Sequence, residues 1–389
     1  MRHYGFLDRD YRERLFLHPP TPFEADSDLD VLGVALGATL YCPATRPRLA
    51  DDILRRAQAG VTSVVVCLED AVPDRDLPAA ERNAVAELRR LAGLAGERPL
   101  VFVRVRSAAQ IAMLVAGLGP AVGVLTGFVV PKFAEEPGKA YLEATVAATE
   151  QIGRRLMVMP VLEGPEIAHV ETRTDALLGA RSVLDKYREY VPAVRVGATD
   201  LSGAYGLRRP REFTVWDVRV VADVLAAVVN VFTRDPGDSA AGYVVSGPVW
   251  EYFPTPERIF KPLLREAPFI AHEELTLRAE LIARDLDGLI REVLLDRANG
   301  LMGKTVIHPS HVPAVHALSV VTTEEFRDVQ DILASKRAGG ATASSFGNKM
   351  NESKPHSAWA HRTLQRSRVF GVAREGVTFV DLLAAGLRP

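Results

Sequence analysis

Residues 63–72 read SVVVCLEDAV, a short run of β-branched residues that ends in two carboxylates. A run this short and this apolar is typical of a strand buried on both faces, as the strands of a parallel sheet are. Glu69 and Asp70 follow directly, so they would lie at the carboxyl end of the strand. In a parallel α/β barrel that end carries the active site. The stretch therefore predicts a buried parallel strand with chemistry at its end.

The same sequence pattern recurs along the chain. Short β-branched runs alternate with stretches of helical periodicity, which occupy residues 79–92, 141–152, 214–232 and 274–295. Strands separated by helices predict a parallel sheet with right-handed crossovers. The eight runs are residues 39–42, 63–68, 100–105, 127–130, 156–161, 193–196, 242–245 and 305–307. Eight such units over residues 38–317 predict an α/β protein with a TIM (β/α)8 barrel.

A doubly wound open sheet is the alternative fold. It would need a glycine-rich dinucleotide turn after its first strand. The nearest candidate, residues 117–123, has the wrong final spacing and contains Pro120. No P-loop motif is present either, so the barrel is favoured.

Three regions fall outside the repeat. Residues 1–37 form a polar, proline-containing lead-in, and residues 248–273 predict a long loop after strand seven. The stretch 337–353 is rich in Gly, Ala, Ser and Asn and predicts a flexible linker, with a helix to follow at 357–367. The expected organisation is a lead-in (1–37), a barrel (38–336) and a linker with a C-terminal helical extension (337–389).

Composition excludes several classes of protein. The 47 basic and 49 acidic residues give a net charge of -2, and no Lys/Arg stripe predicts a nucleic-acid partner. Two cysteines, Cys42 and Cys67, are too few for a disulfide framework and are expected to be small buried hydrophobes. No apolar stretch reaches the roughly 20 residues of a membrane span, and the charged N-terminus lacks a signal sequence. We expect a cytoplasmic protein with no membrane partner.

Charged residues follow most of the expected strands. Taken singly, each is better explained as a cap or a salt bridge, but six in register are different because buried charge is costly unless it is paired or metal-bound. Converging carboxylates with flanking cations predict a site for a divalent metal and a small anionic substrate. The residues are Glu69 and Asp70, Arg104 and Arg106, Lys132, Glu163, Asp200, and His308.

The metal is expected at Glu163 and Asp200, which offer hard oxygen ligands on consecutive strands. Two carboxylates completed by substrate and waters are typical of Mg²⁺, and Mn²⁺ is the alternative. His308 and His311 could be proposed as zinc ligands. Pro309 breaks their helical spacing, so this pair is better explained as orienting a loop.

Several motifs together carry a resemblance to a known family. They are Arg46-Pro-Arg48, Leu-Glu-Asp-Ala-Val at 68–72, Val-Arg-Val at 103–105, Pro131-Lys132, Glu163, Gly-x-x-Asp-Leu at 197–201 and Gly-Lys-x-x-Ile-His-Pro at 303–309. The chain resembles the HpcH/HpaI aldolases in their citrate lyase beta-subunit-like branch, which includes malyl-CoA lyases. Its pattern looks closer to the lyase-like proteins associated with bacterial tellurium-resistance gene clusters than to simple citrate lyase subunits.

The resemblance implies a TIM barrel that binds Mg²⁺ and cleaves or forms a carbon–carbon bond beside a carboxylate or a CoA thioester. The expected function is a Mg²⁺-dependent lyase or aldolase that acts through a metal-stabilised enolate. Arg104, Glu69, Asp70 and Lys132 are the expected catalytic residues. The substrate would be bound by Arg104, Glu163, Gly197, Ala198, Thr199, Asp200 and His308.

The chain also departs from the family pattern. Gly164 and Pro165 follow the metal-binding Glu163 where Thr or Ser is usual, and His311 replaces a Gln. Two alternatives therefore stay open. One is a metal-independent aldolase with a Schiff-base lysine, Lys132 or Lys304. The other is a non-catalytic descendant that binds a ligand or partner.

The C-terminal tail has little core of its own, so it must dock somewhere. We expect a homo-oligomer with the tail at an interface. The polar cluster at 348–352 could close the active site, of its own or of a neighbouring subunit, and bring Lys349 or Glu352 to the substrate.

Overall fold

The computed structural model describes the chain except residues 235–241, 253–263, 284–285, 336–339 and 388–389. Eight parallel strands form one sheet in the order β8-β7-β6-β5-β4-β3-β2-β9. A parallel bridge between Gly247, which follows β8, and Lys304 of β9 joins the two edges and closes the barrel. The strands are β2 (Ala38–Pro43), β3 (Ser63–Cys67), β4 (Leu100–Arg104), β5 (Gly127–Val130), β6 (Met157–Leu162), β7 (Ala193–Val196), β8 (Val244–Ser246) and β9 (Lys304–Val306).

Each of the eight predicted strands is present within a residue or two, so the predicted TIM barrel is confirmed. The strands β3, β4 and β5 are buried at every residue, which is why they read as continuous β-branched runs. Cys42 and Cys67 are buried free thiols, as expected.

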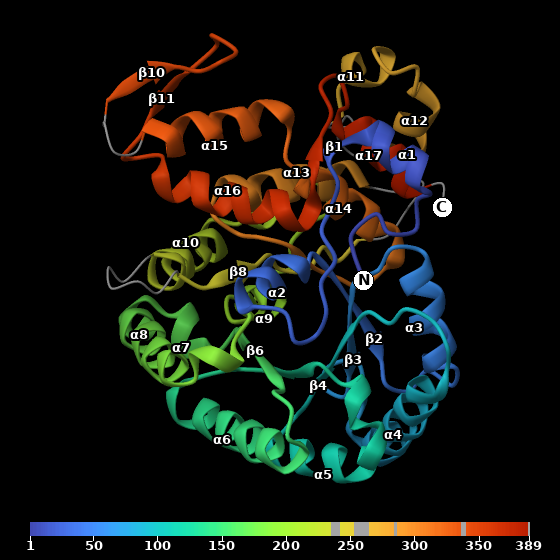
Figure 1. Cartoon of the computed structure of the whole chain (residues 1–389). Coiled ribbons are helices and arrows are strands. Elements are labelled where there is room, and N and C mark those ends of the chain that lie inside the picture. Colours follow the sequence, from blue (N-terminus) through green and yellow to red (C-terminus); the bar gives the residue numbers. More distant parts are fainter. Residues whose placement is uncertain (235–241, 253–263, 284–285, 336–339, 388–389) are drawn as a thin grey trace.

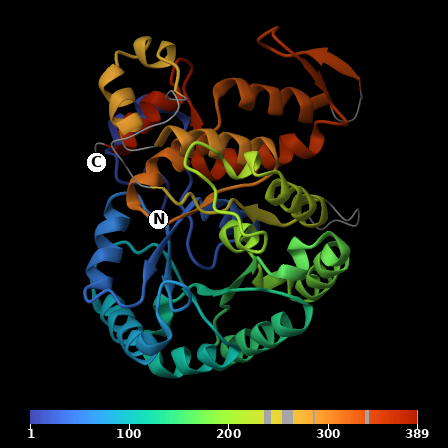
Figure 2. The same cartoon turned by 180° about the vertical axis from the view of Figure 1, so that it is seen from behind.

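Helices surround the strands, as Figures 1 and 2 show. Their inner faces repeat with the period of an amphipathic helix: α4 buries Ala80, Ala84, Leu88 and Leu91. The helices that precede β8 are α1 (Arg9–Leu15), α2 (Leu29–Ala35), α3 (Leu49–Gln58), α4 (Leu77–Gly93), α5 (Ala108–Leu118), α6 (Glu135–Ile152), α7 (Pro165–Ala168), α8 (Val170–Lys186), α9 (Ala198–Gly203) and α10 (Arg219–Thr233).

The remaining helices are α11 (Ala267–Ile270), α12 (Leu275–Ala283), α13 (Leu286–Ala298), α14 (Val312–Ser319), α15 (Thr323–Ser335), α16 (Ser357–Phe370) and α17 (Phe379–Leu387). The stretch 274–295, expected to be helical, carries α12 and α13 on either side of residues 284–285, which lie outside the described residues. The predicted long loop at 248–273 lies partly outside the described residues. Its described part includes Trp250, which is 1% exposed, and the short α11.

The stretch 337–353, predicted to be a flexible linker, is mostly ordered, so that prediction was wrong. Residues 336–339 lie outside the described residues, but β10 (Ala341–Ala343) and β11 (Met350–Glu352) form an antiparallel hairpin. Polar contacts hold the hairpin on α15. Lys349 pairs with Glu324 at 2.6 Å and with Asp328 at 2.7 Å, and the Asn351 amide donates to Asp328. Lys349 is thus bound to α15 of its own chain, and the cluster does not line its own barrel's cavity.

The two ends of the chain pack together on the barrel. Strand β1 (Phe16–His18) pairs with β12 (Val372–Ala373), and α17 packs on α14. The predicted helix at 357–367 is α16, which lies beside α15 and α2. The tail therefore docks on its own barrel.

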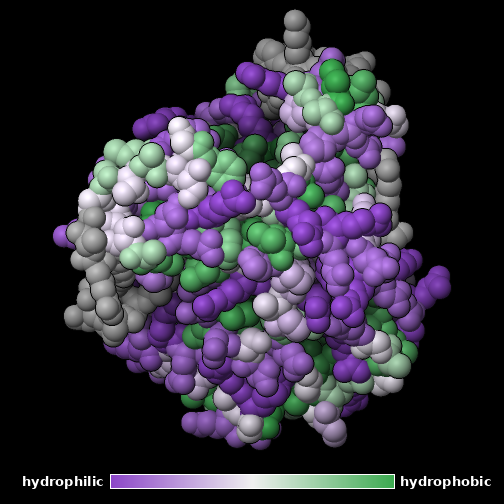
Figure 3. Space-filling view, turned by 45° about the horizontal axis from the view of Figure 1, so that its top comes forward, coloured by the Kyte–Doolittle hydropathy of each residue, from purple (hydrophilic) through white to green (hydrophobic). Residues whose placement is uncertain are grey.

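Hydrophobic residues on the face shown in Figure 3 form small separate patches among hydrophilic ones. Within the described residues, no helix is long and apolar enough to cross a membrane.

Candidate active site

The carboxyl ends of the strands surround a cavity of about 720 Å³. It is open at the end of the barrel where catalytic residues of this fold are placed. The predicted residues Asp70, Arg104, Glu163, Gly197, Thr199 and Asp200 line it. The other lining residues are Tyr41, Val161, Arg195, Val196, Gly203, Val249, Glu251, Thr305 and Ile307.

Arg104, the last residue of β4, holds three carboxylates with one nitrogen. Its Nη2 lies 2.8 Å from Glu69 Oε2, 3.2 Å from Asp70 Oδ2 and 3.0 Å from Glu163 Oε1. Because parallel strands end at one edge, three strand ends meet at this guanidinium. We call Arg104, Glu69, Asp70, Glu163 and Asp200 the mouth cluster.

Glu163 follows β6 and is almost completely buried, with 4% of its surface exposed. Its Oε1 accepts hydrogen bonds from Arg104 and, at 3.1 Å, from the backbone N–H of Lys132. Lys132 has a positive φ of 47°, which is uncommon for a residue other than glycine and aims its N–H at Glu163. Burial raises the pKa of Glu163 to about 7, opposed by Arg104 and reinforced by Asp200.

Asp200 lies in the first turn of α9, after β7. Burial raises its pKa, and the nearby Asp70 adds to this effect. Gly197 lets the two strand ends come together, because a Cβ at this position would lie 2.0 Å from Glu163 Oε2 and 2.7 Å from Glu163 Cβ. The Gly of the Gly-x-x-Asp-Leu motif is therefore required for close approach to the carboxylate.

The other predicted residues lie around this cluster. Lys132 Nζ is 3.8 Å from Glu69 Oε1, and Glu69 itself is mostly buried behind Arg104. Ala198 is buried in the apolar cluster beneath α9 and does not line the cavity. His308, expected to bind the substrate, is exposed and is not among the residues that line the cavity; its Nδ1 lies 2.7 Å from the Ser310 hydroxyl.

Four polar lining residues were not predicted from the sequence: Tyr41, Arg195, Glu251 and Thr305. Arg195 crosses the barrel from β7, is 1% exposed and donates to the hydroxyls of Thr39 and Thr305. Tyr41 lies over the Arg195 guanidinium, 5.5 Å from ring centroid to carbon. Tyr41, Arg195 and Thr305 come from within strands and not from the strand ends at which site residues were expected. Alternation along β7 is the signal that could have found Arg195.

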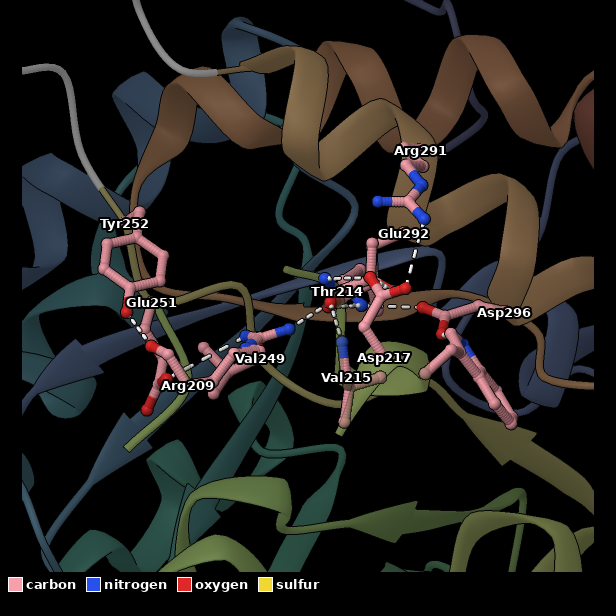
Figure 4. A network of polar contacts seen from close by, with 12 residues as sticks. Arg209, Thr214, Val215, Asp217, Val249, Glu251, Tyr252, Arg291, Glu292 and Asp296 are labelled. Atoms are coloured by element: carbon pink, nitrogen blue, oxygen red, sulfur yellow. Dashed lines mark hydrogen bonds and ion pairs between the residues drawn. The ribbon is translucent and has the colours of Figure 1, made fainter. Parts of the chain in front are cut away.

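Glu251, the fourth missed residue, connects the cavity to a second charged group. Its Oε1 accepts from the Thr199 hydroxyl at 2.7 Å, and its Oε2 lies 3.9 Å from Arg209 Nη2. Arg209 also donates to the Val249 carbonyl and contacts Glu292, as Figure 4 shows. The loop after β8 is thereby fixed beside α9.

Behind Arg209 lies a charged group that is shut off from the cavity. Lys304 is 0% exposed and lies 2.8 Å from Glu292 and 2.6 Å from Asp296. We call Arg209, Glu292, Asp296 and Lys304 the sealed network. The Lys304 ammonium is buried and doubly paired, so it is not placed to attack a carbonyl. The structure thus contradicts the Schiff-base alternative at Lys304.

The donor set available to a metal consists of two carboxylates. Among the residues that the structure describes, no group of three or more His, Cys, Asp or Glu side chains is arranged to hold a metal ion. Glu163 and Asp200 remain as candidate ligands. The pKa of each carboxyl is raised, and the two charged forms would repel each other at the same edge of the barrel. Two carboxylates with waters and substrate suit Mg²⁺, which rarely uses an all-protein cage. The residues therefore fit a Mg²⁺ ion.

Comparison with known proteins adds a family and a fold. A family model described as C–C bond lyase of the TIM-barrel fold matches residues 30–372. None of the curated proteins compared with the chain matches it. The fold is similar to the protein CitE from Mycobacterium tuberculosis in complex with magnesium, acetoacetate and coenzyme A, at a TM-score of 0.51 and 21% identity over 86% of this chain and 99% of that one. A citrate lyase from Burkholderia xenovorans LB400 gives a TM-score of 0.56 at 14% identity over 89% and 96% of the two chains.

Proposed function

We propose a function from one premise: the chain belongs to the C–C bond lyases of the TIM-barrel fold, as its motifs predicted. The proposed activity is a Mg²⁺-dependent cleavage or formation of a carbon–carbon bond in a small carboxylate or acyl-CoA substrate. The reaction would be of the retro-aldol or retro-Claisen type, which leaves an enolate.

The observation that carries the proposal is the charge imbalance of the mouth cluster. Three carboxylates pair with the Arg104 guanidinium, and a fourth, Asp200, lines the same open cavity. Burial and, after it, the neighbouring carboxylates raise the pKa of Glu163 and of Asp200, which disfavours their charged forms unless a cation joins them. Glu163 and Asp200 would hold Mg²⁺ at this point. The bound ion would supply positive charge that stabilises an enolate oxygen as it develops.

Arg104 is suited to grip the substrate's carboxylate. Its Nη2 is occupied by the three carboxylates, but its buried Nε has no hydrogen-bond partner. A buried guanidinium N–H without a partner is costly, and a substrate oxygen would satisfy it. Arg104 would thus orient the substrate while it keeps Glu69 and Glu163 in place.

Glu69 is the group best placed to hold and move a proton. Burial raises its pKa, and a hydrogen bond with Asp70 adds to this effect. A carboxyl group with a raised pKa can both accept and return a proton near neutral pH. Lys132, 3.8 Å away and half exposed, would add positive charge at the cavity rim.

Calorimetric titration of MgCl₂ into the purified chain tests the metal site. We expect wild type to bind Mg²⁺ and Asp200→Ala to bind it at least about tenfold more weakly, since even outer partners of metal ligands change affinity by about 10–100-fold. Asp223→Ala, on the exposed face of α10, is the matched control and should bind as wild type does. Equal Mg²⁺ affinity in wild type and Asp200→Ala would contradict the proposal.

Turnover assays with hydroxy acids and acyl-CoA thioesters, with Mg²⁺ or with chelator, then test the reaction. Metal-dependent cleavage of a member of the panel supports the lyase. Trapping of a substrate adduct on Lys132 by borohydride would instead support the Schiff-base alternative. Mg²⁺ binding without turnover of any panel member would favour the ligand-binding descendant.

A further inference from the structure

A second cavity lies at the opposite end of the barrel. Its volume is about 990 Å³, larger than that of the candidate active site. It is lined by the end of α10, by residues 300–302 just before β9, and by α13, α15 and α16. Residues that precede strands lie at the amino end of a barrel, where catalytic groups of this fold are not found. The cavity is therefore separate from the mouth cluster.

The charges around this cavity are unbalanced in the positive direction. Among its described lining residues, the charged ones are Arg234, Arg297, Arg362 and Arg366 and one carboxylate, that of Glu325. These five groups sum to +3, although the whole chain carries -2. A local excess of this size attracts an anion, and it disfavours a metal cation.

Arg366 shows that the excess is built into the fold. It comes from α16, is 4% exposed and pairs with Glu325 at 2.9 Å. Its Nη2 makes that pair, whereas its buried Nε lacks a hydrogen-bond partner. Buried guanidinium N–H groups without acceptors are costly, so an acceptor-rich ligand in the cavity would be stabilised.

Two further arginines are held in fixed positions beside it. Arg297 Nη1 donates to the Leu318 carbonyl at 2.8 Å, and its Nη2 lies 4.0 Å from Glu325. Arg362 donates through Nη2 to the Thr233 carbonyl. Each carbonyl contact orients a planar guanidinium without neutralising it. Planar forks of this kind bind phosphate in a bidentate way.

An aromatic ring shares the cavity wall with the arginines. Trp359 lies three residues before Arg362 and seven before Arg366, so the three share one face of α16. Its ring is 40% exposed, in a chain where most large apolar side chains are buried. An exposed indole beside guanidinium groups offers a stacking surface for a flat base next to phosphates.

We propose that this cavity binds a nucleoside polyphosphate, with its phosphates on Arg297, Arg362 and Arg366 and its base on Trp359. A ligand with one carboxylate would neutralise only one of the three excess positive charges. A ligand with two or three phosphates would match them. The volume lies at the upper end of the range of about 300–1,000 Å³ for small-molecule sites. The inference does not depend on the reaction at the mouth cluster.

Titration of ATP and of pyrophosphate into the full chain tests this. The salt should be about 150 mM, where the Debye length is about 8 Å and loose surface attraction is screened. We expect wild type to bind both ligands, Arg362→Ala to bind both at least about tenfold more weakly, and Arg362→Lys to fall between because it keeps the charge but loses the fork. Arg362 is exposed, so its replacement should leave the fold intact, which circular dichroism would verify.

Two further variants decide the outcome. Arg89→Ala, an exposed arginine on α4 remote from the cavity, should bind both ligands as wild type does. Trp359→Ala should weaken ATP binding and leave pyrophosphate binding unchanged. The proposal is overturned if neither ligand binds, or if Arg89→Ala weakens binding as much as Arg362→Ala. Unchanged ATP affinity in Trp359→Ala would overturn the assignment of a base to Trp359.

Discussion

The mouth cluster and the sealed network are built from the same kinds of side chain but differ in balance and in access. The mouth cluster has four carboxylates for one guanidinium and faces a cavity of about 720 Å³. The sealed network has two carboxylates, Glu292 and Asp296, for two cations, Arg209 and Lys304. A balanced, closed group holds the barrel together. An unbalanced, open group leaves room for a cation and an anionic ligand, and so marks the site of chemistry.

The largest effect is expected from removal of a cation in the sealed network. Lys304→Met would leave Glu292 and Asp296 buried without their ammonium partner. Breaking a buried pair in this way costs about 3–5 kcal/mol. Urea denaturation should show this loss in the free energy of unfolding.

The matched control is Lys139→Met, which breaks an exposed pair with Glu143 on α6. An exposed pair contributes about 0–1 kcal/mol, so the control should stay close to wild type. If Lys304→Met lowered the free energy of unfolding by less than about 1 kcal/mol, the sealed network would not be a stabilising element.

Removal of a charge from the mouth cluster should instead increase the free energy of unfolding. In metal-free protein, Glu163→Gln removes a buried charge and keeps an acceptor for Arg104 and for the Lys132 N–H. The folded-state pKa of Glu163, about 7, is above its ordinary value of 4.5. At about 1.4 kcal/mol per pKa unit, the variant should be more stable than wild type by about 3–4 kcal/mol at pH 8.

This gain should disappear in acid. The folded carboxyl keeps its proton up to about pH 7, whereas the unfolded one loses it near pH 4.5. The contribution of the Glu163 carboxyl to the free energy of unfolding of the wild type is therefore complete below pH 4.5 and is lost as the pH rises through 7. Denaturation of both proteins in chelator at pH 4 and pH 8 measures the difference. A variant less stable than wild type at pH 8 would show that the ion pair with Arg104 outweighs the cost of burial.

The smallest of these effects concerns the contact between two strand ends. In Gly197→Ala the new Cβ would lie 2.0 Å from Glu163 Oε2, so the carboxylate must move. We expect Mg²⁺ affinity to fall by about tenfold, or about 1.4 kcal/mol. The control is Gly203→Ala at the end of α9, where a Cβ meets no atom within 4 Å. Equal Mg²⁺ affinity in the two variants would show that Glu163 tolerates displacement.

Much of the barrel could be predicted because its information is local. A strand buried on both faces must be apolar throughout, so runs such as Ser63–Cys67 are visible in the sequence. Carboxyl ends of parallel strands meet at one edge, which is why Glu69, Arg104 and Glu163 were expected together. The metal pair followed from the same rule.

The hairpin at 341–352 shows where local information failed. Its Gly, Ser and Asn residues are typical of a flexible linker, yet Lys349 and Asn351 bind Asp328 on α15. No composition reveals a partner more than 20 residues away in the chain. The same limit hid Arg195, whose hydroxyl partner Thr39 is 156 residues distant.

The sequence by itself determined the barrel, the family and the edge at which chemistry is placed, because strand burial and strand direction fix these through neighbouring residues. Only the tertiary structure decided which charges are balanced. It sealed Lys304 between Glu292 and Asp296, left Glu163 and Asp200 beside an open cavity, and gathered arginines around a second one. The physical reason is that the free energy of a charge depends on its burial and its partners, and both are set by side chains far apart in the chain.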